Sequence, residues 1–461
     1  MSGPRPVHLV GIGGAGMSGL ALLAQAAGYR VSGTDRDESA TLVALRAAGV
    51  DARAGHGADA LPADAAALVV STAIRADNPE LVEARRRGLP VLHRSELLAE
   101  LMSGRRGLAV AGAHGKSTTS AMLHAALGDA SAAVGATIAG GEGTGAVWGT
   151  GPWFVAEADE SDRSLLNLSP EAAILLNVDH DHHATFATID DVRDVFRAFV
   201  ARLPPDGVLV VGPDADARAC AESAPCAVRL VGDVEGAFCR VERVGGRPGF
   251  ALALADGRRV EVPLAVAGAH NAENAACALA LADWCGVPLD LAASRLAGFS
   301  GVGRRMEPRG VAAGVEVVDD YAHHPAEIRA TLAAARERTP GRVLVVFQPH
   351  LPSRTRALGG ELAEALGAAD VAVVTEIYLA REPADPQVTG RSVAERVPPP
   401  TTAIFAPTLA EATEAVLDLA RPGDLVLTMG AGDITTIGQE LVARLERRRD
   451  DGNDHERTDP A

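Results

Sequence analysis

The sequence predicts an α/β fold of three domains, each built around a largely parallel sheet. The chain has 461 residues, which corresponds to about three domains at ~150 residues each. Short β-branched runs alternate with Ala- and Leu-rich stretches of helical length, and this repeated strand–helix–strand order produces parallel sheets with right-handed crossovers. The alternation of strands and helices restarts after Gly104. It restarts a second time at the glycine-rich segment 299–308. These breaks predict domains at 1–104, 105–298 and 299–448.

Each predicted domain has its own series of strands. In the first, a strand enters a glycine turn within 7–14, a helix covers 17–28, and further strands lie at 29–35 and 67–74. In the second, strands are expected at 108–112, 153–161 and 172–179, with short strands and turns over 203–263 and a long helix at 268–286. In the third, strands are expected within 315–325, 342–350, 370–378, 401–407 and 424–433. The charged residues 449–461 contain Pro and Gly, which predicts a disordered tail.

Composition argues against several classes of protein. The chain has 43 Lys plus Arg against 60 Asp plus Glu, a net charge of −17, whereas a nucleic-acid-binding protein is usually basic. The five cysteines form no C-x-x-C pair and their number is odd, so a reduced, cytoplasmic chain is the simplest interpretation. No apolar run reaches the ~18 residues of a membrane span, and the first residues lack a signal-peptide pattern. We expect no nucleic-acid or membrane partner, and a monomer or weak homodimer.

The chain contains a single lysine, Lys116. It follows the segment Gly112–Gly115, where a predicted strand gives way to a helix. Glycines let backbone N–H groups approach phosphate oxygens, and the helix N-terminus adds a positive dipole end. A lysine is a compact charge that suits the β- and γ-phosphates, while the Ser117 hydroxyl can hold Mg²⁺. The strict G-x-x-x-x-G-K spacing fails at Val110, so a solvated lysine in an ordinary turn stays open as the alternative.

A second glycine cluster lies near the start of the chain. Gly11, Gly13 and Gly16 match G-x-G-x-x-G after a predicted strand, and Asp35 follows about 20 residues later, as in dinucleotide-binding domains. The general interpretation is a ligand with a diphosphate at the N-terminus of the following helix. Close packing of the helix on the strand, with no ligand, is the alternative.

Acidic residues follow two strands of the predicted second domain. Glu157, Asp159, Glu160 and Asp162 come after one strand, and the histidine- and aspartate-rich segment 177–183 follows the next. Carboxylates beside an ATP loop are the expected partners of Mg²⁺. The density of His and Asp also suits zinc, although the phosphate loop and the oxygen ligands favour Mg²⁺. For any single carboxylate, a solvated loop is an equal alternative.

Taken in order, these motifs resemble those of the Mur ligase family. They are GIGGAGMS at 11–18, GAHGKS at 112–117, EADESD at 157–162, NVDHDH at 177–182, HNAENA at 270–275, RRM at 304–306, DDYAHHP at 319–325, FQPH at 347–350 and GAGD at 430–433. The resemblance covers the chain except its tail. It implies a Rossmann-like UDP-sugar domain, a central P-loop ATPase-like domain with a parallel sheet, and a C-terminal Rossmann-like domain that binds an amino acid.

The resemblance also implies an activity. Members of the family activate a carboxylate as an acyl phosphate with ATP and Mg²⁺, and the amine of an amino acid then attacks it. The motifs are most similar to those of the member whose substrates are UDP-N-acetylmuramate and L-alanine. Two anions, a carboxylate and a triphosphate, must meet in this reaction, so cations are required to offset their repulsion.

Site residues follow from the resemblance, position by position. The sugar nucleotide is assigned to Gly11, Gly13, Gly14, Ala15, Gly16, Met17, Ser18, Asp35 and Ser71. ATP is assigned to Gly112, Ala113, His114, Gly115, Lys116, Ser117, Thr118, Asn271, Asn274, Arg305 and Asp320. Magnesium is assigned to Ser117, Glu157 and His182. The acceptor amino acid is assigned to Tyr321, His323 and Arg354, and the expected catalytic residues are Lys116, His182, His323 and Arg354.

The chain departs from the family pattern at a few positions. Ala113 stands where Thr is usual, Asp179 replaces Glu, and Met306 replaces Phe. Leu351 occupies a position where some members have arginine, and Pro352 one where an aromatic residue is usual. Arg354 is therefore expected to hold the amino-acid carboxylate largely alone. Some members carry a carbamylated lysine at the magnesium site, which a chain with one lysine cannot provide.

Other classes explain part of the pattern. A nicotinamide-dependent oxidoreductase accounts for the Gly11 cluster and Asp35 but not for the Lys116 loop or the acidic clusters. A nucleotide-regulated binding protein accounts for the phosphate loop without any sugar substrate. Within the family, the ligase that recycles murein peptides is the near alternative, whereas folylpolyglutamate synthetase lacks the amino-terminal glycine domain.

Overall fold

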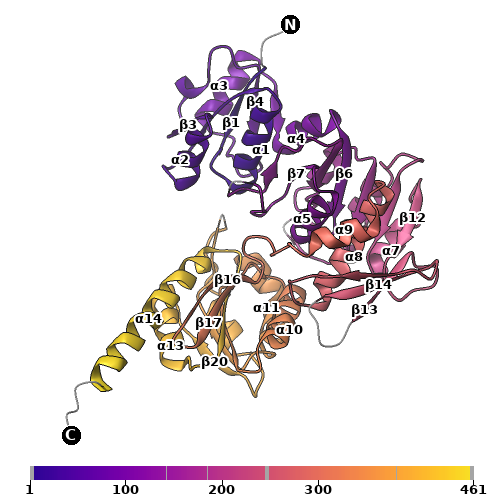
Figure 1. Ribbon diagram of the computed structural model, residues 1–461. Coiled ribbons are helices and arrows are strands. Elements are labelled where there is room, and N and C mark those ends of the chain that lie inside the picture. Colours follow the sequence, from indigo (N-terminus) through magenta and orange to yellow (C-terminus); the bar gives the residue numbers. More distant parts are fainter. Residues whose placement is uncertain (1–4, 142, 184, 244–248, 381, 457–461) are drawn as a thin grey trace. The chain divides into compact units, whose positions relative to one another are not determined.

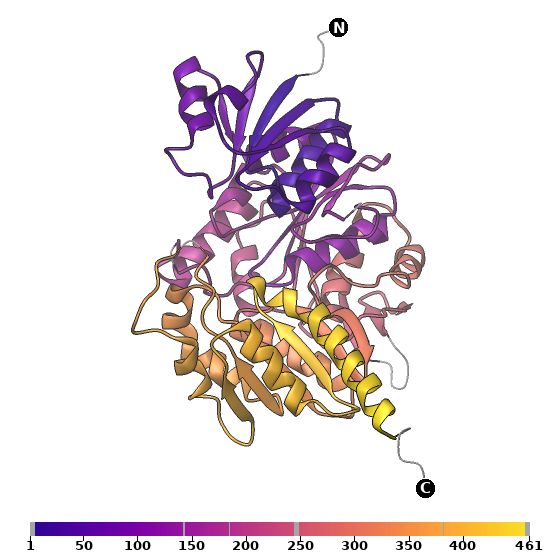
Figure 2. The ribbon, with the colours of Figure 1, turned by 90° about the vertical axis from the view of Figure 1, so that its left-hand side faces the viewer.

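The computed structural model describes residues 5–141, 143–183, 185–243, 249–380 and 382–456, with side chains as far as Arg448. Its contacts divide the chain into two compact units. The first unit comprises Met1–Asp179, Thr188–Ala265 and Ala272–Val302, and the second comprises His180–Ala187, Val266–Asn271 and Gly303–Ala461. The first unit contains two mainly parallel sheets and the second contains one, with helices packed around each (Figures 1 and 2).

The first sheet has the strand order β3-β2-β1-β4-β5, and all its pairs are parallel. Its strands are β1 (Pro6–Val10), β2 (Arg30–Asp35), β3 (Asp51–Ala54), β4 (Ala67–Val70) and β5 (Val91–His93). Its helices are α1 (Ala15–Ala26), α2 (Ala40–Ala47), the short η1 (Ala58–Ala60), α3 (Pro79–Arg87) and α4 (Arg94–Ser103). The direction of winding reverses between β1 and β4, and ligands of such sheets bind in the crevice beyond the carboxyl ends of the strands at this reversal.

The second sheet has the order β12-β11-β10-β6-β9-β7-β8 and is parallel except for β8. Its strands are β6 (Arg106–Ala111), β7 (Ser131–Ala133), β8 (Ala146–Val147), β9 (Trp153–Glu157), β10 (Ala172–Leu175), β11 (Val208–Val211) and β12 (Ala227–Leu230). Strands β9 and β10 flank β6 on its two sides. The segments that follow these three strands therefore meet at one edge of the sheet.

Helices and a small antiparallel sheet complete this part of the chain. The helices are α5 (Lys116–Leu127), η2 (Ser164–Asn167), α6 (Ile189–Val200), α7 (Ala215–Ala221), α8 (Ala269–Trp284) and α9 (Leu289–Leu296). The antiparallel strands are β13 (Cys239–Arg243), β14 (Phe250–Leu254) and β15 (Arg259–Val262). They form the short strands that the sequence predicts within 203–263.

The third sheet has the order β16-β17-β21-β18-β19-β20, with β16 antiparallel to the rest. Its strands are β16 (Glu307–Ala312), β17 (Val315–Asp320), β18 (Val343–Phe347), β19 (Val371–Val374), β20 (Thr402–Phe405) and β21 (Leu425–Met429). Alternate residues of β18 enter different cores: Val345 packs in the cluster with Leu362, whereas Val346 packs in the cluster with Val416. Helices therefore cover both faces, as a parallel sheet requires.

The helices of the third sheet are α10 (Pro325–Arg338), α11 (Pro352–Leu366), α12 (Gly390–Ala394), α13 (Leu409–Leu419), η3 (Asp433–Thr436) and α14 (Ile437–Glu456). Helix α14 includes residues 449–456 of the predicted tail, and disorder of the tail stays a prediction. The remaining predicted tail, 457–461, lies outside the described residues.

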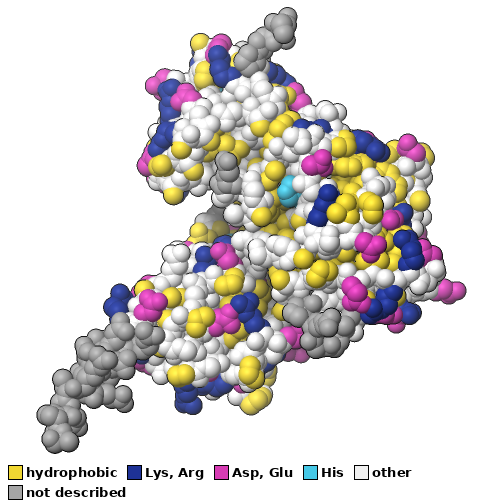
Figure 3. All heavy atoms as spheres, viewed as in Figure 1, with side chains coloured by type: hydrophobic (Ala, Val, Ile, Leu, Met, Phe, Trp, Pro, Cys, Tyr) yellow, Lys and Arg dark blue, Asp and Glu magenta, His cyan; other side chains and the backbone are white. Residues whose placement is uncertain are grey.

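The predicted fold class is confirmed: three mainly parallel α/β sheets follow one another along the chain. Among the described residues, no helix is both long and apolar enough to cross a membrane. Figure 3 shows basic and acidic side chains interspersed over the face in view.

Candidate active site

The phosphate loop lies between β6 and α5, where the sequence places it. Gly112 has φ +141° and Gly115 has φ +82°, backbone conformations that side chains rarely adopt. A Cβ on Gly112 would also lie 3.0 Å from the Leu176 Cβ. Helix α5 begins at Lys116, and the N–H groups of Gly115, Lys116, Ser117 and Thr118 have no acceptor within the described part of the chain. These four donors make the helix start suitable for an anion.

Asn177, two residues after the end of β10, fixes the shape of this loop. Its side-chain oxygen accepts the N–H of His114 at 2.8 Å, and its side-chain amide donates to the His114 carbonyl at 3.1 Å. Its backbone carbonyl accepts the N–H of Ala113 at 3.1 Å. The motif NVDHDH contained this residue, but the sequence did not single it out, since the clamp depends on the pairing of β10 with β6.

Replacing Asn177 by Ala is expected to weaken binding of ATP, the ligand predicted for this loop, by about 10-fold, because the loop loses two side-chain hydrogen bonds worth about 0.5–1.5 kcal/mol each. The affinity for a sugar nucleotide should stay within about 2-fold. Isothermal titration with a non-hydrolysable ATP analogue measures the first effect. Equal weakening of both ligands would instead indicate general loss of structure in this unit.

Lys116 lies folded against its own loop in the described structure. Its Nζ donates to the carbonyls of Gly112 at 2.7 Å and Ala113 at 3.0 Å, and it pairs with the Glu160 carboxylate at 2.9 Å. The side chain is only 13% exposed, so the alternative of a solvated surface lysine is wrong. Burial lowers the pKa of the ammonium, but the carboxylates of Glu160, Asp159 and Glu157 outweigh it and the net pKa is raised.

Glu157, the last residue of β9, faces the start of α5. Its carboxylate accepts the Ser117 hydroxyl at 3.0 Å and the Gly135 N–H at 2.6 Å. Burial raises its pKa, and the nearby Lys116 charge only partly opposes this. A hydroxyl and a carboxylate side by side at the phosphate loop are oxygen ligands of the kind that Mg²⁺ prefers. The predicted metal ligands Ser117 and Glu157 are therefore adjacent.

Asp159 stands two residues further on, beside two cations. Burial raises the pKa of its carboxyl, but the charges of Lys116 and Arg94 and a hydrogen bond from Ser161 bring the pKa down to about 2. The Arg94 guanidinium donates to it at 2.7 Å. Asp159 is therefore ionised at neutral pH, and Arg94 is a neighbour of the site that the sequence analysis did not identify.

The glycine turn of the first sheet follows β1, next to the carboxyl end of β4. Asp35 accepts the Gly13 N–H at 2.8 Å and the Arg36 N–H at 2.7 Å, so its carboxylate shapes the turn. Ser71 directly follows β4 and lies beside the turn because β1 pairs with β4. This is the reversal point of the sheet, where a ligand is expected.

Some backbone N–H groups of this turn donate within the protein, and others have no acceptor among the described residues. The N–H groups of Met17 and Ser18 donate to the Gly14 carbonyl, and both side chains are 3% exposed. Within the described residues, the N–H groups of Ala15 and Gly16 have no acceptor. In this turn the N–H groups of Ala15 and Gly16 can therefore offer donors to a diphosphate, whereas the Met17 and Ser18 residues are buried.

Two predicted ATP residues of α8 have different surroundings. The Asn274 side chain lies beside the phosphate loop, where its Oδ1 is 2.9 Å from the position that a Cβ on Gly115 would take. Asn271 belongs to the other unit, and its amide donates to the Ala267 carbonyl at 2.6 Å. His182, the remaining predicted metal ligand, also belongs to the other unit and has φ +54°.

In the second unit, predicted site residues follow β17. The Asp320 carboxylate accepts the N–H groups of Met306 and Ala322, both at 2.8 Å, and is almost fully buried. Burial raises its pKa although the Arg305 charge opposes this. Asp320 therefore holds the segment 304–306 in place. The Arg305 guanidinium lies 5.4 Å from the Tyr321 ring centre and pairs with Glu327 at 3.2 Å.

Arg354, at the start of α11, is buried and bound to Asp181. Its Nε and Nη2 donate to the Asp181 carboxylate at 2.8–3.0 Å, and its Nη1 lies 3.1 Å from His350 Nδ1. The residue is 5% exposed, so a surface ion pair is excluded. Burial raises the pKa of Asp181, but Arg354, His182 and His323 more than offset it and the pKa is lowered.

His323 lies beside the same ion pair. Its Nε2 is 3.9 Å from Asp181 Oδ2, and its Nδ1 is 3.0 Å from the Tyr321 carbonyl. Burial lowers its pKa to about 3; the Glu327 carboxylate opposes the shift and the Arg354 charge adds to it. The imidazole is therefore neutral at pH 7. Three residues of this unit, Arg304, Met306 and Leu351, have positive φ values, a backbone conformation that residues other than glycine rarely adopt.

The fold and the site together define an α/β protein with a phosphate-binding loop, flanking carboxylates and a second glycine turn at a sheet reversal. Three regions match family descriptions: "Mur ligase family, catalytic domain" at 6–106, "Mur ligase middle domain" at 152–282, and "Mur ligase, glutamate ligase domain" at 304–432. The chain belongs to the Mur ligase family.

Relatives match over nearly the whole chain. A UDP-N-acetylmuramate–L-alanine ligase of Streptomyces griseus is 45% identical, over 96% of this chain and 98% of that protein. The protein of the same name from Saccharopolyspora erythraea is 47% identical, over 96% and 93%. The solved UDP-N-acetylmuramate-alanine ligase MurC of Thermotoga maritima has a TM-score of 0.80 at 28% identity, covering 96% and 99%. A murein peptide ligase of Psychrobacter arcticus has a TM-score of 0.71 at 25% identity, covering 96% and 99%.

Proposed function

We propose that the chain is an ATP-dependent, ADP-forming ligase that joins L-alanine to the lactyl carboxylate of UDP-N-acetylmuramate. Two observations that agree carry this proposal. The phosphate loop has a buried lysine paired with a carboxylate, and the chain is 45–47% identical, over 96% of its length, to ligases of that name. The product is a precursor of peptidoglycan, so the role is in cell-wall synthesis. The nicotinamide alternative leaves Lys116 and its carboxylate neighbours without a role.

ATP and magnesium fit the residues of the loop. Four N–H groups at the start of α5 offer donors to phosphate oxygens, and Asn274 borders the loop at Gly115. The Ser117 hydroxyl and the Glu157 carboxylate, 3.0 Å apart, supply two oxygen ligands, and His182 is proposed to complete the set. Bound there, Mg²⁺ would reduce the negative charge of the phosphates.

The chemistry requires two anions to approach each other. A lactyl carboxylate oxygen attacks the γ-phosphorus of ATP, the bond to the β-phosphate oxygen breaks, and ADP leaves. The Lys116 ammonium lies on the phosphate loop, bonded to the carbonyls of Gly112 and Ala113. It is proposed to move from these carbonyls to the transferring phosphoryl group, whose negative charge it would stabilise. The amine of L-alanine then attacks the acyl carbon, and inorganic phosphate leaves.

The second unit is proposed to supply the acceptor amino acid. Arg354 is proposed to hold the alanine carboxylate, and His323 and Tyr321 to border the amine. Because His323 is neutral at pH 7, it can accept a hydrogen bond from the amine. Arg305 is proposed to contact the nucleotide. Asp320, also assigned to ATP from the sequence, is almost fully buried and is proposed to act by holding the segment 304–306.

We also propose domain boundaries at 1–104, 105–298 and 299–448, a cytoplasmic location, and a monomer or weak homodimer. The boundaries rest on the breaks in the strand–helix pattern, and the location rests on the cysteine pattern and the small-molecule substrates. A nucleic-acid or membrane partner is not part of the proposal. Limited proteolysis and light scattering test the boundaries and the oligomeric state.

Phosphate release tests the function directly. The full chain with ATP, Mg²⁺ and UDP-N-acetylmuramate should release phosphate only when L-alanine is added, and mass spectrometry should show the amide. The peptide L-alanyl-γ-D-glutamyl-meso-diaminopimelate, added in place of L-alanine, is the second arm. Product with this peptide alone would reassign the chain to murein-peptide ligation.

Removing either proposed metal ligand is expected to raise the Mg²⁺ requirement. Glu157→Ala and His182→Ala should each shift the half-saturating Mg²⁺ concentration by about 10-fold or more, as loss of a ligand weakens a metal site. The KM for UDP-N-acetylmuramate should change much less. Magnesium titrations that overlay the parent curve would remove that residue from the metal site.

A further inference from the structure

Arg94 occupies a position that the assigned roles leave unexplained. It is the first residue of α4, and its side chain reaches across to the acidic segment that follows β9. Its Nη2 lies 2.7 Å from Asp159 Oδ2 and 3.9 Å from Asp162 Oδ2. The side chain is 29% exposed, so the guanidinium is accessible from one side.

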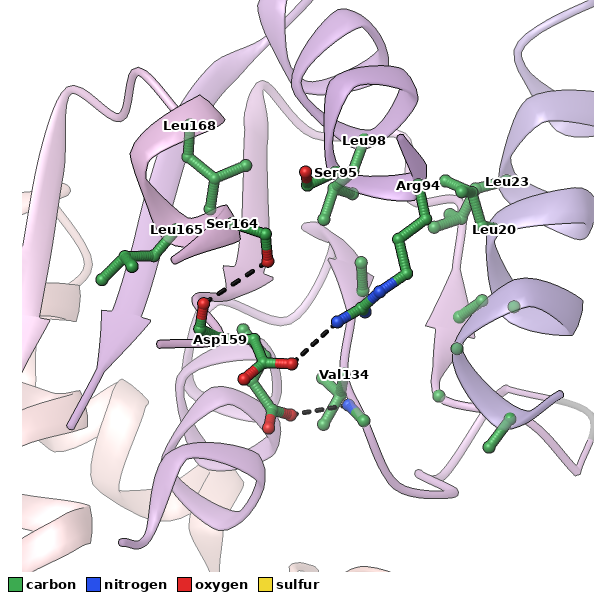
Figure 4. A pocket seen from close by; sticks show the side chains of 18 residues that line it. Leu20, Leu23, Arg94, Ser95, Leu98, Val134, Asp159, Ser164, Leu165 and Leu168 are labelled. Atoms are coloured by element: carbon green, nitrogen blue, oxygen red, sulfur yellow. Dashed lines mark hydrogen bonds and ion pairs between the residues drawn. The ribbon is translucent and has the colours of Figure 1, made fainter. Parts of the chain in front are cut away.

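A cavity of about 110 Å³ opens beside this guanidinium (Figure 4). Its lining includes Gly16 of α1 and the carboxylates of Glu157 and Asp159. Apolar side chains such as Leu20 and Leu165 also line it. Figure 4 shows Arg94 extending down from α4 toward Asp159, between α1 and the 3₁₀ turn η2. The cavity therefore joins the glycine turn to the carboxylates of the phosphate loop.

Arg94 also lies next to backbone donors of the glycine turn. Its Nη1 is 3.5 Å from the position that a Cβ on Gly16 would take. Within the described residues, the N–H groups of Ala15 and Gly16 have no acceptor. The guanidinium therefore lies beside the start of α1, where these two N–H groups are available, and guanidinium groups bind phosphate oxygens by paired, charge-assisted hydrogen bonds.

We propose that Arg94 is a substrate-binding residue: it binds the diphosphate of the UDP-sugar together with the N–H groups of Ala15 and Gly16, and leaves Asp159 to do so. This rests on the proposed function, which supplies the sugar nucleotide. In the free protein Asp159 competes for the guanidinium. Binding of the diphosphate therefore removes one cation from the acidic segment beside Lys116 and makes Asp159 available to a cation on the ATP side. By linkage, each ligand then raises the affinity for the other.

The first test measures binding of UDP to the full chain without ATP, by titration calorimetry. Arg94→Gln should weaken UDP binding by about 10- to 100-fold, the effect of losing charge-assisted hydrogen bonds. UDP-N-acetylglucosamine and UDP-N-acetylmuramate should weaken by the same factor, because all three carry the diphosphate. If only UDP-N-acetylmuramate is affected, Arg94 binds the lactyl carboxylate and the proposal is wrong.

The second test separates substrate binding from a structural ion pair. Asp159→Asn also breaks the pair, yet it should strengthen UDP binding several-fold, because Arg94 no longer has to leave a carboxylate. In an Arg94→Gln background the same Asp159→Asn change should have no effect, as a double-mutant cycle requires for coupled residues. Two results would contradict the proposal that Arg94 leaves Asp159 for the diphosphate. One is weaker UDP binding by Asp159→Asn, and the other is an equal gain in UDP affinity in both backgrounds.

Arg193→Gln is the matched control. Arg193 is 28% exposed, bonds to Asp216 at 2.9 Å, and lies in α6 of the same unit. It should leave UDP affinity unchanged, and thermal unfolding should show that all variants fold. Failure of the wild-type chain to bind UDP would count against the proposed function, whereas normal binding by wild type and Arg94→Gln alike would count against Arg94 alone.

Discussion

Lys116→Arg is expected to lower kcat by about 100-fold or more, while the chain stays folded. The ammonium lies within 3.0 Å of two loop carbonyls and of Glu160, in a space that fits a compact charge and not a planar guanidinium. The lost stabilisation of the transferring phosphoryl group corresponds to about 2.7 kcal/mol, within the range for electrostatic groups in active sites. A coupled ADP assay at saturating substrates measures it.

Two variants accompany this measurement. Lys116→Met should be at least as slow, and it should also lose stability, because the Glu160 carboxylate is almost fully buried and would lack its cation. Arg197→Lys exchanges a cation on the exposed side of α6 and should be neutral. Near-normal turnover of Lys116→Arg would mean that the lysine only supports the loop.

Arg354→Ala is expected to raise the KM for L-alanine far more than the KM for ATP, and to destabilise the protein. Removing one partner of a buried ion pair costs about 3–5 kcal/mol, since the remaining charge stays buried. Here the Asp181 carboxylate would lose all three hydrogen bonds from the guanidinium. Denaturant unfolding measures the stability, and steady-state kinetics with L-alanine and ATP varied separately measure the two constants.

Asp181→Asn tells the two roles of Arg354 apart. It breaks the same ion pair, so it should lose stability as well, but it leaves the guanidinium present for the alanine carboxylate. The KM for L-alanine should then rise only with Arg354→Ala. Equal changes of this KM in both variants would show that Arg354 acts by holding Asp181 in place, with the amino acid bound elsewhere.

The glycine turns and the strand–helix alternation could be predicted because local sequence is sufficient for them. Gly112 and Gly115 take φ values that favour glycine, so the phosphate loop is visible in the sequence, and Lys116 begins α5 as expected. Repeated β-branched runs predicted the three sheets because parallel strands are buried on both faces. The side-chain partners could not be predicted in this way.

The sequence by itself determined the class of fold, the position of the phosphate loop and the family. Only the tertiary structure decided that Asn177 clamps His114 across 63 residues, that Arg94 meets Asp159 across 65, and that Arg354 meets Asp181 across 173. It also decided that the Met17 and Ser18 side chains are buried and that Asp35 serves the glycine turn. The physical reason is that such pairs depend on strand order and helix packing, which are set by the burial of the whole core, and no local pattern encodes them.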